Sequence, residues 1–172
     1  QGTESRKARL LKNKEYIYLS KIDDRQFTKF RIMYENLKPD TLVVGSSRTM
    51  NISNEVLKEN VFNMSVNGAS IEDHITLILM ALEKFKPKRI ILGLDPWLLN
   101  KNNYQFRWKS LSKEFELAKK IIENPSKKLE MFIFAENKNK NFYEEIIDKI
   151  YSYLNIRSLE IYKKNKLNLN KP

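Results

Sequence analysis

Cysteine is absent from this chain of 172 residues, and histidine occurs only once. The absence of cysteine excludes a disulfide framework, a thiolate nucleophile and a zinc site built on thiolates, although it does not identify the redox compartment. One histidine without a clustered set of carboxylates does not make a transition-metal site. We therefore expect no metal and no other cofactor. The sequence also lacks any run of about 18 apolar residues, so it predicts no membrane-spanning helix.

Apart from these absences, the composition is that of a globular protein with one domain. Hydrophobic residues make up 41% of the chain, which is enough for an ordinary core at this length. The chain opens with Gln1 and a polar segment that does not resemble a secretory signal. We expect an anchor or a signal upstream of it, and a further segment downstream is equally expected.

Positive charge is the strongest bias of the composition, with a formal net charge of +11. Such a charge favours association with phosphate polymers or anionic surfaces. The lysines are nevertheless scattered among Asn and Ile residues, as in 138–141 and 163–166, without the interleaved aromatic side chains of a strand-binding surface. A solvated, lysine-rich surface is the better interpretation, and we expect no specific nucleic-acid partner.

Three segments follow one another along the chain. Residues 1–38 are predicted to be a charged helical lead-in, whose last helix is stopped by Pro39. Residues 39–162 are predicted to form an α/β domain. Residues 163–172 are rich in Lys and Asn and are predicted to be a flexible basic tail.

Three of the four glycines follow short apolar runs that are typical of β-strands. The glycines are Gly45, Gly68 and Gly93, and the runs cover residues 41–44, 61–63 and 89–92. Open α/β folds place their sites where strand ends turn toward one edge of the sheet. The sequence therefore points to a site at this edge before it points to a reaction.

A helix is predicted between the second and the third strand. Ser70 and Asp73 have the spacing of a capping box, and apolar residues recur at helical spacing from Ile71 until Pro87. Strand, helix and strand within roughly 30 residues form a βαβ unit, which requires parallel strands.

The second half of the chain carries weaker signals. Residues 96–107 have no clear period and are predicted to be a loop that is long enough to indicate function. Helices are predicted at 112–123 and 141–154, and a late strand at 156–162. The run 129–134 fits a buried strand and a helical turn equally well.

The three glycine-containing segments also resemble a known family when they are taken together and in order. Residues 45–48 (Gly-Ser-Ser-Arg) resemble the first block of the SGNH hydrolases, the Gly-Asp-Ser-Leu (GDSL) lipase and esterase superfamily. Residues 63–70 are similar to the second block, and residues 93–96 (Gly-Leu-Asp-Pro) stand where the third block has Gly-x-Asn-Asp. The resemblance is greatest to the divergent cell-envelope branch, which includes D-alanyl-lipoteichoic acid transfer proteins and relatives of alginate O-acetyltransferase.

This resemblance implies a fold, a nucleophile and a reaction. The implied fold is a three-layer α/β/α, flavodoxin-like domain with a mostly parallel sheet, incomplete at the C-terminal end of this chain. Ser47 takes the nucleophile position, with Ser46 in place of the usual aspartate, and the N–H groups of Ser47 and Gly68, beside Asn67, bind the oxyanion. The implied activity is serine-dependent acyl transfer or ester hydrolysis on a cell-envelope glycan or related polymer. The alternative interpretation is that Gly-Ser-Ser only turns the chain and caps a helix.

Asp95 departs from the family pattern. The family has an asparagine there whose amide donates to the oxyanion, whereas an ionised aspartate only accepts hydrogen bonds. Asp95 is expected to orient Arg48 or Arg107, to accept a hydrogen bond from Ser47 or substrate, to stay protonated in a desolvated site, or simply to start an Asp-Pro turn. Trp97 in the following loop is expected either to line a glycan or acyl pocket or to cover the core.

The general base is the second departure from the family. Family members draw it from a late Asp-x-x-His block, but His74 is the only histidine of this chain. A helix N-terminus favours a neutral imidazole, which suits a base, whereas a lone histidine beside an apolar stripe is more often a packing residue. Three explanations stay open: the base lies in sequence outside this chain, a partner supplies it, or the domain is a catalytically silent glycan-binding or assembly module.

Partners and location follow from the same resemblance. It implies a glycan or acyl-donor substrate, a membrane-protein partner and an extracytoplasmic place in the cell envelope. Phosphate or nucleotide binding at the same strand ends fits the basic charge, but the chain lacks a glycine-rich phosphate loop.

Overall fold

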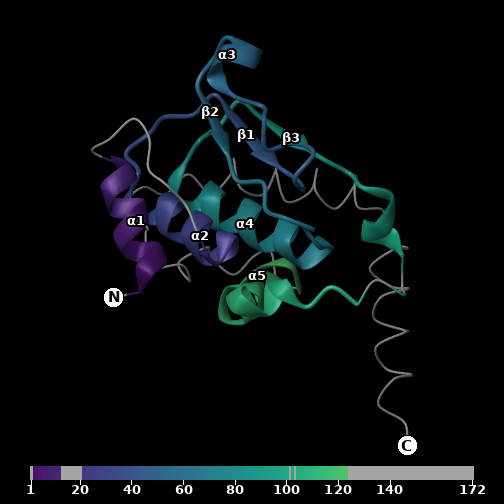
Figure 1. Cartoon of the computed structure of the whole chain (residues 1–172). Coiled ribbons are helices and arrows are strands. Elements are labelled where there is room, and N and C mark those ends of the chain that lie inside the picture. The colour runs from purple at the N-terminus through teal and green to yellow at the C-terminus, as the bar shows by residue number, and fades with distance from the viewer. Residues whose placement is uncertain (1, 13–20, 101, 103, 124–172) are drawn as a thin grey trace, which may run out of the picture.

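The chain folds into a mixed α/β structure with a small parallel sheet (Figure 1). A computed structural model describes residues 2–12, 21–100, 102 and 104–123. Four predicted segments lie outside the described residues, namely the run 129–134, the helix 141–154, the strand 156–162 and the tail 163–172.

Within the described residues the sheet has three strands, β1 (Thr41–Val44), β2 (Val61–Asn63) and β3 (Arg89–Leu92). They lie in the order β2-β1-β3, and both outer strands pair with β1 in parallel. Thr41 is level with Val61 on one side and with Arg89 on the other. The carboxyl ends of all three strands therefore lie along the same edge of the sheet. The strands predicted at 41–44, 61–63 and 89–92 and their parallel direction are therefore confirmed.

Helix α4 (Ile71–Lys84) connects β2 to β3 and forms the centre of the structure. The Ser70 hydroxyl accepts a hydrogen bond from the Asp73 N–H at 3.3 Å, and the Asp73 carboxylate accepts one from the Ser70 N–H at 2.8 Å. This reciprocal pair is the capping box that the sequence predicts. The helix lies against β1 and is also contacted by α2 (Asp24–Tyr34) and α5 (Ser112–Glu123) (Figure 1).

The lead-in contains two helices, α1 (Thr3–Lys12) and α2. Helix α2 ends at Tyr34 and does not continue to Pro39, where the sequence predicts its end, because the backbone becomes extended at Glu35. The Lys84 ammonium of α4 donates to the carbonyls of Ile32 and Met33 at 2.7 and 2.8 Å, which satisfies carbonyls that the helix end leaves without partners.

The bounds of α5 agree with the predicted helix at 112–123. The remaining helices are short, namely α3 (Asn54–Leu57) and two 3₁₀ helices, η1 (Pro96–Leu99) and η2 (Arg107–Leu111). The predicted loop 96–107 therefore begins with a helical turn, in which the Leu98 N–H bonds the Asp95 carbonyl at 3.0 Å. No helix in the described residues is both long and apolar enough to cross a membrane.

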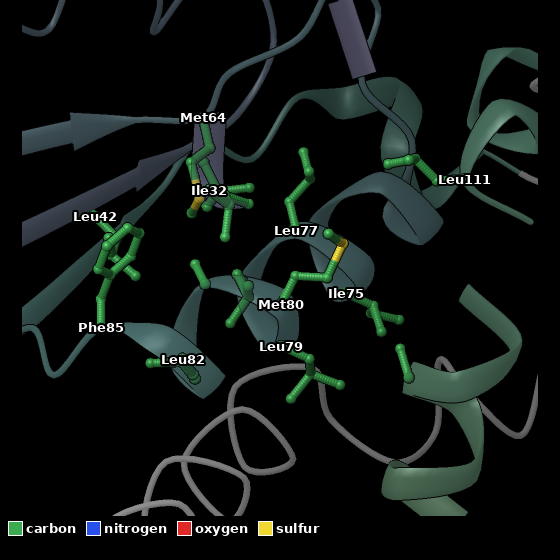
Figure 2. Packing of buried hydrophobic residues seen from close by; sticks show 14 of the residues in the cluster. Ile32, Leu42, Met64, Ile75, Leu77, Leu79, Met80, Leu82, Phe85 and Leu111 are labelled. Carbon is green, nitrogen blue, oxygen red and sulfur yellow. The ribbon is translucent and has the colours of Figure 1, made fainter. Parts of the chain in front are cut away.

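The hydrophobic core lies between the sheet and α4, as Figure 2 shows. Leu42 of β1, Met64 after β2 and Leu77 of α4 are completely buried in it. Ile32 of α2 is buried in the same cluster, so the second lead-in helix shares the core of the sheet. Burial of this apolar surface holds the sheet edge and its loops in place.

Candidate functional site

The three predicted strand ends lie side by side at one edge of the sheet. The Gly93 N–H donates to the Val44 carbonyl at 2.8 Å, which joins the end of β3 to the end of β1. The Val66 N–H donates to the Gly45 carbonyl at 3.0 Å, which joins the segment after β2 to the same place. The loops that carry Ser47, Gly68 and Asp95 therefore leave the sheet from neighbouring positions.

Thr49 packs into the space between Gly45 and Gly93. A Cβ on Gly93 would lie 2.7 Å from Thr49 Cγ2, and a Cβ on Gly45 would overlap Thr49 Oγ1. The Thr49 hydroxyl donates to the Ser46 carbonyl at 3.0 Å and lies 2.7 Å from the Ser65 hydroxyl. Both glycines are therefore required by the close approach of one side chain.

Asn63 at the end of β2 holds the turn that follows β1. Its amide nitrogen donates to the carbonyls of Thr49 at 2.7 Å and Ile52 at 2.9 Å, while its amide oxygen accepts from the Ser65 N–H at 2.9 Å. One side chain thus ties the serine turn to the neighbouring strand.

Ser46 and Ser47 occupy different environments in this turn. Ser46 is buried, its carbonyl accepts from the Thr49 N–H at 3.1 Å and its hydroxyl accepts from the Arg48 N–H at 3.3 Å. Ser47 is exposed, and neither its hydroxyl nor its N–H has a hydrogen-bond partner among the described residues. The serine in the candidate nucleophile position is thus the one that faces solvent.

Gly68 forms a turn between β2 and α4. Its φ of +53° is left-handed, a conformation that favours glycine. Within the part of the chain that the structure describes, its N–H donates no hydrogen bond, as is also true of Ser47. A guanidinium nitrogen of Arg107 lies 3.9 Å from the position that a Cβ on Gly68 would take. The turn therefore has an available N–H with a cation beside it.

Asp95 is buried at the end of β3, with 7% of its surface exposed. One of its oxygens lies 3.4 Å from a guanidinium nitrogen of Arg48, which directly follows Ser47 in the chain. The Arg48 guanidinium also lies over the Trp97 ring, 4.9 Å from its centroid. Of the two arginines considered as partners of Asp95, the structure pairs Arg48 with it and places Arg107 beside Gly68.

His74 lies at the N-terminus of α4 and is 2% exposed. Its Nδ1 lies 2.7 Å from the Ser70 carbonyl oxygen, and its Nε2 lies 3.1 Å from the Gly93 carbonyl oxygen. Both ring nitrogens therefore face backbone oxygens, and neither presents a lone pair to Ser47. The ring connects α4 to the end of β3.

Four residues of this region were not singled out by sequence reasoning, namely Asp24, Arg25, Thr49 and Gln105. Arg25 of α2 is almost completely buried and contacts the Asn67–Gly68 turn, and Gln105 donates to the Gly68 carbonyl at 2.7 Å. For Arg25 a signal exists, because it is spaced from Thr28 and Ile32 as residues of one helix face are. Thr49 and Gln105 carry no comparable signal.

In the described ranges, no group of three or more His, Asp or Glu side chains is arranged to hold a metal ion. No family model, curated protein or solved structure matches this chain.

Proposed function

We propose that this chain belongs to an SGNH-hydrolase-like acyltransferase or esterase, in which Ser47 attacks an acyl ester on a cell-envelope glycan or related polymer. One observation carries the proposal. An exposed serine hydroxyl lies on the loop after β1, two loops of this sheet edge each contain an N–H without a partner in the described residues, and backbone hydrogen bonds join these loops at their bases. A nucleophile beside preorganised N–H donors is the arrangement that acyl transfer requires.

The proposed fold is the three-layer, flavodoxin-like one. The strand order β2-β1-β3 is that of the first three strands of such a sheet, whose ligands bind beyond the carboxyl ends of the strands. The candidate site lies at those ends. Ile90, Ile91 and Leu92 of β3 are only partly buried, whereas both faces of a parallel sheet are normally covered, so the proposed fold includes a further layer over this part of the sheet.

In the proposed reaction, the Ser47 oxygen forms a bond to the acyl carbon, and the carbonyl oxygen becomes an oxyanion that the N–H groups of Ser47 and Gly68 stabilise. The bond to the leaving alcohol then breaks, which leaves an acyl-serine ester. A second alcohol or water takes the acyl group in the reverse sequence. The serine proton passes through a general base to the leaving oxygen; because both nitrogens of His74 face backbone oxygens, the proposal places that base outside the described residues.

Asp95 has a consistent place in this proposal. An unpaired carboxylate at the third strand end would repel the oxyanion, but its pairing with the Arg48 guanidinium offsets that charge. The Arg48 guanidinium in turn lies over the Trp97 ring, and Arg48 directly follows the candidate nucleophile in the chain. We propose that Asp95 positions Arg48, and that Arg48 and Trp97 contact the substrate.

A catalytically silent glycan-binding or assembly module is the second candidate. The engagement of His74 by two backbone carbonyls favours it, because in the described residues no other histidine is available to act as a base for Ser47. In this alternative, the loops at this sheet edge bind a glycan and no acyl group is transferred.

The proposal is tested with a serine-directed fluorophosphonate probe on the full-length protein. The wild type should be labelled and Ser47→Ala should not, because the probe phosphonylates an activated serine oxygen. Ser53→Ala is the matched control, since Ser53 is also exposed but lies at α3, away from the candidate site, and should be labelled like the wild type. Equal labelling of wild type and Ser47→Ala contradicts the proposal. Glycan binding that survives Ser47→Ala, without turnover, supports the silent module.

A further inference from the structure

Arg25 at the start of α2 is buried, with 1% of its surface exposed. Its Nε and Nη2 atoms donate to the two carboxylate oxygens of Asp73 at 2.9 and 2.8 Å, and its Nη1 donates to Asp24 at 2.9 Å. Asp73 is equally buried. A buried ion pair is expensive to form and replaceable by apolar side chains, so its presence alone does not indicate a role in stability.

The same groups extend to the turn at Asn67 and Gly68. Arg25 Nη2 donates to the carbonyls of Asn67 at 3.0 Å and Gly68 at 3.4 Å. The second carboxylate oxygen of Asp24 accepts from the Asn67 N–H at 2.7 Å. Gln105 Nε2 donates to the Gly68 carbonyl at 2.7 Å and lies 3.3 Å from Asp73 Oδ2. Two neighbouring side chains of α2 and one from a distant part of the chain thus meet at the backbone of Asn67 and Gly68.

These contacts use three of the four polar backbone groups of Asn67 and Gly68. The N–H and carbonyl of Asn67 and the carbonyl of Gly68 are all bonded to side chains, and only the Gly68 N–H has no partner in the described part of the chain. A glycine with positive φ has many alternative conformations, so a fixed direction for its N–H has to come from such contacts. A fixed N–H is also what distinguishes an effective oxyanion donor, because it needs no reorganisation during the reaction.

We propose that Arg25 is a positioning residue, which together with Asp24 and Gln105 holds the Asn67–Gly68 turn so that the Gly68 N–H points at the developing oxyanion. This inference rests on the proposed acyl transfer at Ser47. Asp73 anchors the arrangement, because the carboxylate that caps α4 also binds Arg25. The N-terminal segment therefore contributes to the site, since α2 supplies two of the three side chains that hold the turn.

The test uses variants that weaken the turn without leaving a buried charge alone. Arg25→Met would strand the Asp73 carboxylate in the interior and is expected to unfold the protein. Asp24→Ala and Gln105→Ala each remove one contact to the turn from a side chain that is only partly buried. Lys29→Ala is the matched control, because Lys29 lies on the same helix and pairs with Glu114, away from the turn.

Two measurements are made on each variant of the full-length protein. Amide hydrogen exchange at Asn67, whose N–H is bonded to Asp24, should become about three- to tenfold faster in Asp24→Ala and Gln105→Ala, and stay unchanged in Lys29→Ala. The maximal rate of fluorophosphonate labelling at Ser47 should fall about tenfold in both variants while the half-saturating probe concentration stays constant, because the lost interaction acts in the transition state. Arg25→Lys should give exchange and labelling rates between those of the wild type and those of Asp24→Ala, since lysine keeps the charge and loses the bidentate geometry.

The outcomes separate this inference from the proposed function. Wild-type protein that is not labelled contradicts the proposed acyl transfer, whereas the exchange data still decide whether these side chains hold the turn. Unchanged exchange in Asp24→Ala and Gln105→Ala overturns the inference. Faster exchange with an unchanged labelling rate also overturns it, because the contacts would then be structural only.

Discussion

Thr49 shows how much a single side chain decides at this sheet edge. Its methyl and hydroxyl groups occupy the space that Gly45 and Gly93 leave open, and its hydroxyl is bonded to the turn that presents Ser47. The two glycines are therefore not interchangeable with alanine, although neither has a positive φ. The position of Ser47 therefore depends on the absence of a side chain at both Gly45 and Gly93.

A double-mutant cycle tests this packing. Gly93→Ala should lower the free energy of unfolding by about 1–3 kcal/mol, because its new Cβ would crowd Thr49 Cγ2. Thr49→Ser removes that methyl group and should restore part of the loss in the double variant. The measurement is denaturant unfolding of the wild type, both single variants and the double variant.

Gly45→Ala provides the control for this cycle. Its Cβ would overlap the Thr49 hydroxyl oxygen, which serine retains, so Thr49→Ser should not relieve that clash. A Gly93→Ala protein as stable as the wild type, or equal rescue of both glycine variants, would show that Thr49 does not fill this space.

Among the secondary-structure elements, α4 connects the site to the core. Its N-terminus carries the capping box and His74, and its buried side chains pack beneath the sheet. Helix α3 differs, because its N-cap residue Ser53 makes no capping hydrogen bond and none of its residues is buried. The two helices therefore offer a matched comparison of a capped and an uncapped N-terminus.

Ser70→Ala should lower the free energy of unfolding by about 1 kcal/mol, because the Asp73 N–H would lose its acceptor. Ser53→Ala should leave stability nearly unchanged, since no cap hydrogen bond is lost. Thermal or denaturant unfolding of both variants gives the comparison. Equal losses in the two variants would mean that the side-chain cap contributes nothing to α4.

At the scale of the whole molecule, the sheet has a candidate site at one edge and a set of ion pairs at the other. Glu59 accepts a hydrogen bond from the Thr41 hydroxyl at 2.5 Å and also pairs with Arg89, while Lys88 pairs with Asp40 at 2.8 Å. The hydrogen bond from Thr41, and after it the Arg89 guanidinium, lower the pKa of Glu59 below its ordinary value. The charged form of Glu59 is therefore favoured by folding.

The sign of the resulting pH dependence follows from this lowered pKa. The contribution of Glu59 to stability is complete above its ordinary pKa of 4.5 and is lost as the pH falls through the lower pKa of the folded state. The difference in melting temperature between the wild type and Glu59→Gln should therefore shrink as the pH is lowered from about 6 to about 3. Because Glu59 is only partly buried and its partner Arg89 is exposed, we expect a small effect.

Glu55→Gln is the control for the pH experiment. Glu55 is exposed on α3 and forms no ion pair with a described residue, so its replacement should leave the melting profile close to that of the wild type. A difference between wild type and Glu59→Gln that is constant over the whole pH range would show that the carboxylate does not act through its charge.

Local sequence patterns predicted the elements near the site well. The apolar runs before Gly45, Gly68 and Gly93 are strands, and the pattern from Ser70 is a capped helix. These features depend on neighbours within a few residues, which is why periodicity and cap chemistry can identify them. The early end of α2 was not predicted, because it is stabilised by Lys84 of another helix.

The amino-acid pattern alone indicates which segments become strands and helices and which small and polar residues stand at the strand ends. The contact of Arg25 with Asp73, 48 positions away, the approach of the His74 ring to the Gly93 carbonyl and the packing of Thr49 against Gly93 became visible only in the folded structure. Hydrogen-bonding periodicity is local, whereas these contacts form when the sheet and α4 bury a shared core and bring distant segments together.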